Sequence, residues 1–211
     1  MSSALPPNRL LEIEQALNKR WPENKIEPSL DRIIALLDAL GSPQLSYPTI
    51  HLAGTNGKTT TARMIDQLLT ELGYRVGRYT SPHLESFTER ISIKGAPISD
   101  EMMIKTYDDI ALYLDLIDSR QPIPISYFEG ITAMAFVAFA EYPVDVGVIE
   151  AGMGGQWDAT NVLASLVSVM TPIGFDHMEY LGNTLSEIAQ TKAGIFKPES
   201  NVVLAAQSSE V

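Results

Sequence analysis

Hydrophobic positions recur with a helical period in two segments near the start of the chain. NRLLEIEQALNKR, residues 8–20, places its leucines and isoleucine on one face, with Asn8 as the predicted N-cap. SLDRIIALLDALG, residues 29–41, has the same period, with Ser29 as the predicted cap and Gly41 as the predicted end. The pattern therefore predicts two amphipathic helices joined by a loop.

Short apolar runs alternate with helical patterns along the rest of the chain. The runs at 144–150 and 165–170 are too uniformly apolar to have one face in water, which is typical of buried parallel strands. ISIKGAPIS predicts a hairpin that turns at Lys94 and Gly95. The other predicted strands cover 49–53, 75–80 and 201–206, and further helices are predicted over 59–73, about 100–118, 131–142 and 185–192.

Two capping boxes mark helix starts. Ser126 with Glu129 precedes a very apolar helix that Pro143 stops, and Thr184 with Glu187 precedes the helix that ends near Lys192. Strands that alternate with helices in this way predict an α/β fold with a mostly parallel sheet and helices on both faces.

Composition limits the class of protein. The 211 residues are 45% apolar and 19% charged, which is typical of a globular chain and argues against extensive disorder. A net charge of −11 argues against a general nucleic-acid binder. Cysteine is absent, no apolar run reaches the length of a membrane span, and no signal peptide is visible, so a cytoplasmic protein is predicted.

The segment GTNGKT follows a predicted strand and opens a predicted helix. Loop N–H groups and the helix N-terminus both favour an anion at that place in an α/β fold. Gly54 and Gly57 allow close backbone approach, Lys58 can reach terminal phosphates, and Thr59 can offer its hydroxyl to Mg²⁺. The strict GxxxxGK[ST] pattern fails because Leu52 stands at its first position, so a glycine-rich helix cap beside a surface lysine is the alternative.

A carboxylate ends another apolar run, at Glu150. A carboxylate at the end of a buried strand is unfavourable unless it is paired or coordinated. It could be a metal ligand, although a salt bridge or a helix cap is the alternative from sequence. The glycine-rich stretch at 151–161 follows directly, so two glycine-rich loops after two strands predict one shared cleft.

Several motifs together resemble folylpolyglutamate synthase and dihydrofolate synthase of the Mur ligase superfamily, over essentially the whole chain. TSPHL and YFE are similar to the folate branch, whereas GTNGKT and the DH element are shared with cell-wall Mur ligases. The resemblance implies a P-loop NTPase-like Mur ligase central domain. The matching motifs are GTNGKT at 54–59, TSPHL at 80–84, YFE at 127–129, GMGGQWDATN at 152–161, DHMEYLG at 176–182 and KAGIFKP at 192–198.

The resemblance implies an ATP-dependent amide ligase of folate biosynthesis. A substrate carboxylate takes the γ-phosphoryl group of ATP, and the amine of L-glutamate attacks the acyl phosphate. The implied carboxylate substrate is dihydropteroate, a (tetrahydro)folate, or both. A monomer with no nucleic-acid or membrane partner is expected.

The resemblance also implies roles for particular residues. Phosphates are assigned to Gly54, Thr55, Asn56, Gly57, Lys58, Thr59 and Thr60. A first Mg²⁺ is assigned to Thr59, Ser81 and Glu150, and a second to His177 and a carbamylated Lys192. The implied catalytic residues are Lys58, Glu150, His177 and Lys192, and the implied residues for the pterin-bearing substrate are Ser126, Phe128, Asp158 and Ala159.

From sequence alone these assignments have ordinary alternatives. Lys192 near a helix end could be a surface lysine favoured by the helix dipole, and His177 a core or surface histidine. A carbamate would require Lys192 to be neutral, which burial favours. Phe128 could be a core aromatic, and Met134, Phe136 and Phe139 are predicted in the core.

Two features depart from the family pattern. Gln156 and Trp157 stand where the family usually has Arg and Leu, which removes a cation. Residues 1–205 are predicted as the ATP-binding domain with 206–211 as a tail, and the C-terminal α/β domain of the family is absent, so an inactive fragment is expected. The alternatives are a Mur-type cell-wall amino acid ligase and a non-catalytic nucleotide-binding module.

Overall fold

The computed structural model of the chain describes residues 8–22 and 27–211, so the predicted loop between the first two helices lies partly outside the described residues. The helices are α1 (Arg9–Asn18), α2 (Asp31–Ala39), α3 (Lys58–Glu71), α4 (Asp100–Asp118), α5 (Tyr127–Glu141), α6 (Met178–Leu181) and α7 (Leu185–Ala193), with 3-10 turns η1 (Pro43–Leu45), η2 (Phe87–Arg90) and η3 (Ala159–Val162). The strands are β1 (Thr49–Ala53), β2 (Val76–Tyr79), β3 (Ile91–Ile93), β4 (Ala96–Pro97), β5 (Val146–Glu150), β6 (Val167–Met170) and β7 (Asn201–Leu204).

The described strands form one sheet in the order β4-β3-β2-β5-β1-β6-β7. Strands β2, β5, β1, β6 and β7 are parallel, and β3 and β4 add an antiparallel hairpin at one edge. The hairpin turns at Lys94 and Gly95, both with positive φ, as predicted. Strand β1 lies between β5 and β6, so the carboxyl ends of these three strands meet at one edge of the sheet.

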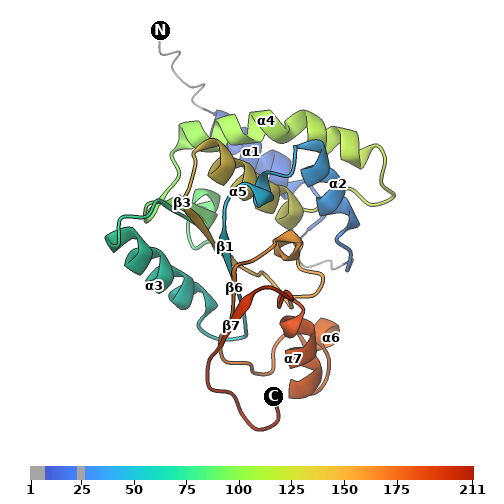
Figure 1. Cartoon of the computed structure of the whole chain (residues 1–211). Helices are drawn as coiled ribbons and strands as arrows, with labels where there is room; N and C mark the ends of the chain where they lie inside the picture. Colours follow the sequence, from blue (N-terminus) through green and yellow to red (C-terminus); the bar gives the residue numbers. More distant parts are fainter. Residues whose placement is uncertain (1–7, 23–26) are drawn as a thin grey trace.

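Helices cover both faces of the sheet (Figure 1), as the alternating pattern predicts. Helix α3 packs on one face, where Ala62 meets Leu52 and Val148. Helix α5 packs on the other face, and α1, α2 and α4 pack outside it. Helix α5 is therefore enclosed on nearly all sides, which explains why its sequence is apolar all round.

The core predictions for α5 are confirmed. Met134, Phe136 and Phe139 are fully buried within the largest apolar cluster. None of the helices in the described ranges 8–22 and 27–211 has the length and apolar character needed to span a membrane.

Local signals located most helix ends correctly. Both predicted capping boxes form, at Ser126 with Glu129 and at Thr184 with Glu187. Asn8 is at the N-cap position, but its side chain makes no capping hydrogen bond, so the prediction is right in position only. Helix α2 begins one residue later than predicted, at Asp31 with Leu30 in the N-cap position, although the Ser29 hydroxyl does accept a hydrogen bond from the N–H of Asp31.

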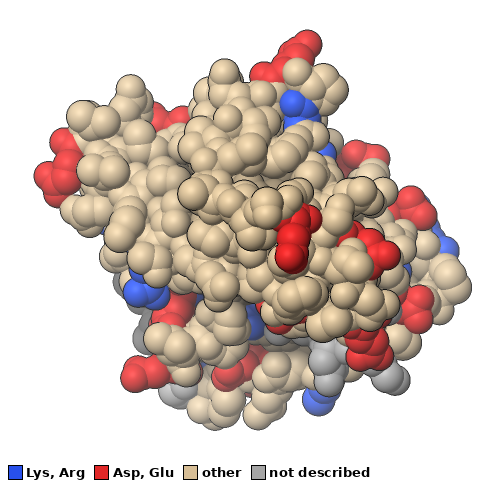
Figure 2. All heavy atoms as spheres, turned by 90° about the horizontal axis from the view of Figure 1, so that it is seen from below, with Lys and Arg blue, Asp and Glu red and all other residues tan. Residues whose placement is uncertain are grey.

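Strand β7 differs from the other parallel strands in exposure. Its residues are exposed, Leu204 to 59%, whereas β1 and β5 are almost completely buried. Figure 2 shows one face of the molecule, on which acidic side chains are scattered and basic side chains are few, in keeping with the net charge of −11.

Candidate functional site

The loop between β1 and α3 is held tightly against the carboxyl end of β6. Gly54 has a φ of +142°, and a Cβ there would lie 2.0 Å from Thr171 Oγ1. The N-cap of α3 is Gly57, also with positive φ. Glycine is required at Gly54 for both angle and space, as predicted for a loop that approaches a ligand closely.

The backbone amides of this loop divide into two groups. The N–H groups of Thr55 and Asn56 both donate to the Pro172 carbonyl, at 3.0 and 3.2 Å. The first N–H groups of α3 have no intrahelical acceptor, which leaves the turn from Gly57 to Thr60 to face an anion. An anion would therefore meet residues 57–60, the second half of the predicted 54–60 segment. Thr55 and Asn56 instead fix the first half of the segment to Pro172.

Two lysines converge on one backbone oxygen. The Nζ atoms of Lys58 and Lys192 lie 3.1 and 3.0 Å from the Gly54 carbonyl oxygen, to which both donate. Lys192 is 2% exposed, and burial, together with the charge of Lys58, lowers its pKa to about 8. Lys192 is thus a buried amine beside the loop, not the surface lysine that its place near a helix end suggests.

Glu150 lies on the other side of the loop, at the end of β5. Both carboxylate oxygens are 2.9 Å from Thr59 Oγ1, and the Ser81 N–H donates to the same carboxylate. Burial raises the pKa of Glu150 to about 7, although the Thr59 hydroxyl and the charge of Lys58 oppose the rise. The structure therefore brings together Thr59, Ser81 and Glu150.

This donor set suits a hard cation. A buried carboxylate with a raised pKa gains from a nearby positive charge, and hydroxyl and carboxylate oxygens are ligands that Mg²⁺ takes. Within residues 8–22 and 27–211, no three His, Asp or Glu side chains cluster as a metal site. A cation beside Glu150 would therefore depend on Thr59, Ser81, water and phosphate oxygens for its other ligands.

His177 stands apart from the lysines in exposure. It has a positive φ of 46° directly before α6, its side chain is 47% exposed, and its Nε2 is 3.5 Å from Asp176 Oδ2. The negative charge of Asp176 also acts on buried Lys192, where it raises the pKa against the effect of burial. Asp176 thus acts on both predicted ligands, and it was not predicted as a site residue.

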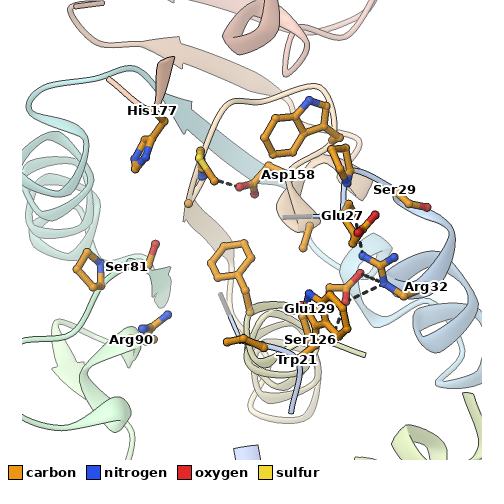
Figure 3. A pocket seen from close by; sticks show the side chains of 18 residues that line it. Trp21, Glu27, Ser29, Arg32, Ser81, Arg90, Ser126, Glu129, Asp158 and His177 are labelled. Carbon is orange, nitrogen blue, oxygen red and sulfur yellow. Dashed lines mark hydrogen bonds and ion pairs between the residues drawn. The ribbon is translucent and has the colours of Figure 1, made fainter. Parts of the chain in front are cut away.

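A cavity of about 260 Å³ opens beside Ser81. Figure 3 shows Ser81, Arg90 and His177 on one side of it and Arg32 on the other. All four residues predicted for the pterin-bearing substrate line this cavity, and they are Ser126, Phe128, Asp158 and Ala159. The second glycine-rich loop and the predicted substrate residues therefore line one cavity, whereas residues 54–60 are not part of its lining. The single cleft predicted for the two glycine-rich loops stays a prediction.

The start of α5 forms one wall of the cavity. The Ser126 hydroxyl accepts from the N–H of Glu129, and the Glu129 carboxylate accepts from the N–H of Ser126. Arg32 Nε donates to both Glu129 oxygens, at 3.0 and 3.2 Å, in a nearly buried ion pair. Sequence reasoning recognised the capping box but missed Arg32, because its partner is 97 residues away.

Aromatic rings provide much of the apolar lining. The Phe128 ring lies 6.2 Å from that of Tyr79, and a Cβ on Gly152 would come within 2.6 Å of Phe128. Trp21 and Trp157 also line the cavity. Flat apolar faces of this kind suit a flat heterocycle.

Asp158 is buried at the N-terminus of η3. Its carboxylate accepts from the backbone N–H groups of Met153 and Thr160, at 2.8 and 2.9 Å, and from the Thr160 hydroxyl. Burial raises the pKa of Asp158, while these donors oppose the rise. Ala159 beside it is 5% exposed at the cavity wall.

The glycine-rich loop after β5 joins the cavity to α7. A Cβ on Gly155 would lie 2.4 Å from the Lys192 carbonyl oxygen, and the Gln156 N–H donates to Thr191. The Gln156 side chain is exposed, whereas Trp157 is half-buried and lines the cavity. Of Gln156 and Trp157, the two residues that differ from the family pattern, Trp157 is therefore the one that changes the cavity wall.

Comparison with known proteins defines the class first. The Mur ligase middle domain family matches residues 52–209, which include both glycine-rich loops and α7. The chain is 56% identical to the dihydrofolate synthase/folylpolyglutamate synthase of Mycobacterium tuberculosis, over 88% of this chain and 40% of that protein. It is 42% identical to the Bacillus subtilis protein of the same name, over 88% of this chain and 43% of that protein.

Solved structures agree with these relatives. Mycobacterium tuberculosis folylpolyglutamate synthase in complex with ADP superposes with a TM-score of 0.89 at 53% identity, covering 96% of this chain and 46% of that one. A complex of FPGS with AMPPCP and folate gives a TM-score of 0.89 at 37% identity, covering 95% and 49%. The chain belongs to the folylpolyglutamate synthase and dihydrofolate synthase family of the Mur ligases, and spans less than half the length of these relatives.

Proposed function

We propose that the chain forms the nucleotide-binding part of an ATP-dependent ligase that joins L-glutamate to dihydropteroate, to (tetrahydro)folates, or to both. The carrying observation is the junction of Lys58, Lys192 and the Thr59–Glu150 pair at one loop. Ser81 links this junction to the aromatic cavity, because its N–H donates to Glu150 and the residue lines the cavity. Anion-binding and cation-binding groups that are linked in this way to a cavity for a flat heterocycle suit transfer of a phosphoryl group to a carboxylate held there.

On the nucleotide side, the chain's own residues bind and orient the phosphates. The first turn of α3 presents N–H groups, and Lys58 supplies positive charge against the charge that develops on the transferred group. Bound magnesium neutralises phosphate charge, and Thr59, Ser81 and Glu150 would hold it. A second ion would be held by His177 and a carbamylated Lys192.

On the substrate side, the cavity holds the heterocycle and directs its carboxylate toward the loop. Phe128 offers a flat face, Ser126 and Ala159 form the wall, and Asp158 is the carboxylate that suits ring N–H donors. The acyl phosphate would form where the cavity meets the lysines, and the glutamate amine would attack it there. We propose that the enzyme works as a monomer in the cytoplasm.

Binding and turnover by the chain of residues 1–211 test the proposal. We expect this polypeptide to bind ATP–Mg and pteroate by calorimetry but to form no amide product from ATP, dihydropteroate and labelled glutamate. The relatives are more than twice as long, and loss of their remaining contacts would remove alignment that can supply roughly 7 to 11 kcal/mol of a barrier.

The full-length Mycobacterium tuberculosis relative is the positive control. Ligation by residues 1–211 within about tenfold of that control, equivalent to about 1.4 kcal/mol, would mean that these residues suffice. Binding of a uridine nucleotide substrate in preference to pteroate would favour a cell-wall ligase instead. Binding of ATP without any pteroate would favour a nucleotide-binding module.

The proposed carbamate on Lys192 predicts a specific label. Since burial lowers the pKa of Lys192 to about 8, a neutral amine is available to react with CO₂ in mildly basic solution. With ¹³C-bicarbonate, we expect a carbamate resonance that Lys192→Arg removes and Lys197→Arg retains, beside the resonance of the α-amino group, which both variants keep. A spectrum that Lys192→Arg leaves unchanged would contradict the assignment.

A further inference from the structure

His51 is a buried titratable residue to which the proposed chemistry gives no role. It lies in the middle of β1 and is fully buried, with its side chain on the sheet face opposite to that of Leu52. Its Nε2 is 2.8 Å from Thr160 Oγ1, 109 residues away. His51 therefore connects the central strand below the nucleotide loop with η3 at the cavity.

The hydrogen-bond chain fixes the direction of each donor. The Asp158 carboxylate already accepts from the backbone N–H groups of Gly152, Met153 and Thr160, so it is an acceptor for the Thr160 hydroxyl as well. The single hydroxyl proton of Thr160 is thereby used, and Thr160 can only accept from the imidazole. His51 is therefore the Nε2–H tautomer, and its Nδ1 has no hydrogen-bond partner within the described residues.

The imidazole stays neutral over the working pH range of a protein. Burial, together with the charge of Lys197, lowers the pKa of His51 to about 3. His51 thus does not take up a second proton near neutral pH, and it serves as a neutral N–H donor to Thr160.

Asp158, at the end of this chain of hydrogen bonds, holds two segments of the cavity wall. Asp158 Oδ2 accepts from the Met153 N–H, and Oδ1 accepts from the N–H and hydroxyl of Thr160. Gly152, Met153 and Ala159 all line the cavity. One carboxylate rotamer therefore joins the glycine-rich loop to η3 across the place where a heterocycle would lie.

We propose that His51 is a positioning residue for this cavity, acting through Thr160 to hold Asp158 in the orientation that binds a pterin ring. This inference rests on the proposed function for the identity of the occupant. Its geometric part, the hold on Asp158 and on the Met153 amide, is independent of any ligand.

The test compares His51→Leu with His51→Gln in residues 1–211. Glutamine keeps an N–H donor near the position of Nε2, whereas leucine fills the space without one. We expect His51→Leu to weaken pteroate binding by about tenfold or more, as supporting-residue changes do, and His51→Gln to stay within about threefold of the parent. ATP binding should remain unchanged in both variants, because Thr55 and Asn56 of the nucleotide loop are held by hydrogen bonds to Pro172 and Gly174 instead of by this chain of hydrogen bonds.

Hydrogen exchange of the Met153 amide gives a readout without ligand. It should accelerate in His51→Leu and stay slow in His51→Gln. An unchanged Met153 exchange rate in folded His51→Leu would overturn the inference even if pteroate binds. Absence of pteroate binding to the parent chain would instead overturn the proposed function, with Met153 exchange still deciding the role of His51.

Thr160 provides a second, independent pair of variants. Thr160→Val keeps the shape and removes the hydroxyl, and Thr160→Ser restores it. Thr160→Val should reproduce the effects of His51→Leu. The double variant should bind pteroate no worse than either single variant, because both substitutions interrupt the same chain of hydrogen bonds. If His51→Leu does not fold, the Thr160 pair decides, and equal pteroate binding by Thr160→Val and Thr160→Ser would overturn the proposal.

Discussion

Glu150→Gln is expected to weaken magnesium-dependent nucleotide binding strongly while the chain stays folded. Glu150 is the carboxylate on which Thr59 and Ser81 converge, and an amide cannot supply the negative charge that a divalent cation requires. Calorimetry with ATP should show affinity in magnesium reduced by roughly 100-fold, the upper range for damage to a metal site. Exposed Glu71→Gln is the matched control and should bind like the parent.

The same substitution should stabilise the ligand-free chain at basic pH. The raised pKa of Glu150, about 7 against the usual 4.5, means that its stabilising contribution is complete below 4.5 and is lost as pH rises through 7. Glutamine undergoes no such loss. At about pH 8 the variant should gain up to about 3 kcal/mol in free energy of unfolding, since one pKa unit corresponds to about 1.36 kcal/mol.

Urea unfolding at several pH values measures this effect. The difference between Glu150→Gln and the parent should be small near pH 5 and grow toward pH 8. A difference in free energy of unfolding that is constant with pH would show that burial of the Glu150 charge is not its cause. Unchanged magnesium-dependent binding would remove Glu150 from the cation site.

Gly54→Ala is expected to eliminate nucleotide binding and to destabilise the fold. A Cβ at this position would lie 2.0 Å from Thr171 Oγ1 and 2.9 Å from the Thr171 carbonyl oxygen, and φ is +142°. Because a backbone oxygen cannot move away as a side chain can, the loop itself must shift. We expect a loss of roughly 2 to 5 kcal/mol in free energy of unfolding, combining positive φ with overpacking.

Gly41→Ala is the control for the backbone angle alone. Gly41 has a φ of +82° at the end of α2, with open space around the position of a Cβ. Gly41→Ala should lose only about 1 kcal/mol in free energy of unfolding and should bind ATP normally. Thermal unfolding and ATP titration of both variants decide the matter, and ATP binding by Gly54→Ala within about tenfold of the parent would refute the steric account.

The elements of this fold were predictable where their signals are local. Capping at Ser126 and Thr184 depends on residues three positions apart, and the turn at Lys94 and Gly95 depends on two adjacent positions. Helix α6 has only four residues and was not predicted, because one turn has too few positions to display a helical period. The exposure of β7 was also not predicted, since its sequence is as apolar as that of a buried strand.

The candidate site divides along the same line. The family resemblance implied that Thr59, Ser81 and Glu150 would meet, and the structure brings them together at the shared edge of the parallel strands. The contact of Arg32 with Glu129 could not be predicted, since it joins elements remote in sequence that many residue pairs could connect equally well. The link from His51 to Thr160 was invisible for the same reason.

The Gly54 carbonyl, as the common acceptor of Lys58 and Lys192, has a consequence for the entropy of ligand binding. A lysine side chain loses rotamer freedom worth roughly 1.5 to 2 kcal/mol when it is fixed. Here the Lys58 ammonium is already held at the loop by folding, so a phosphate arriving there meets a side chain that has already lost much of this freedom. The site is preorganised, and the ordering penalty belongs to the stability of the fold instead of the affinity for nucleotide.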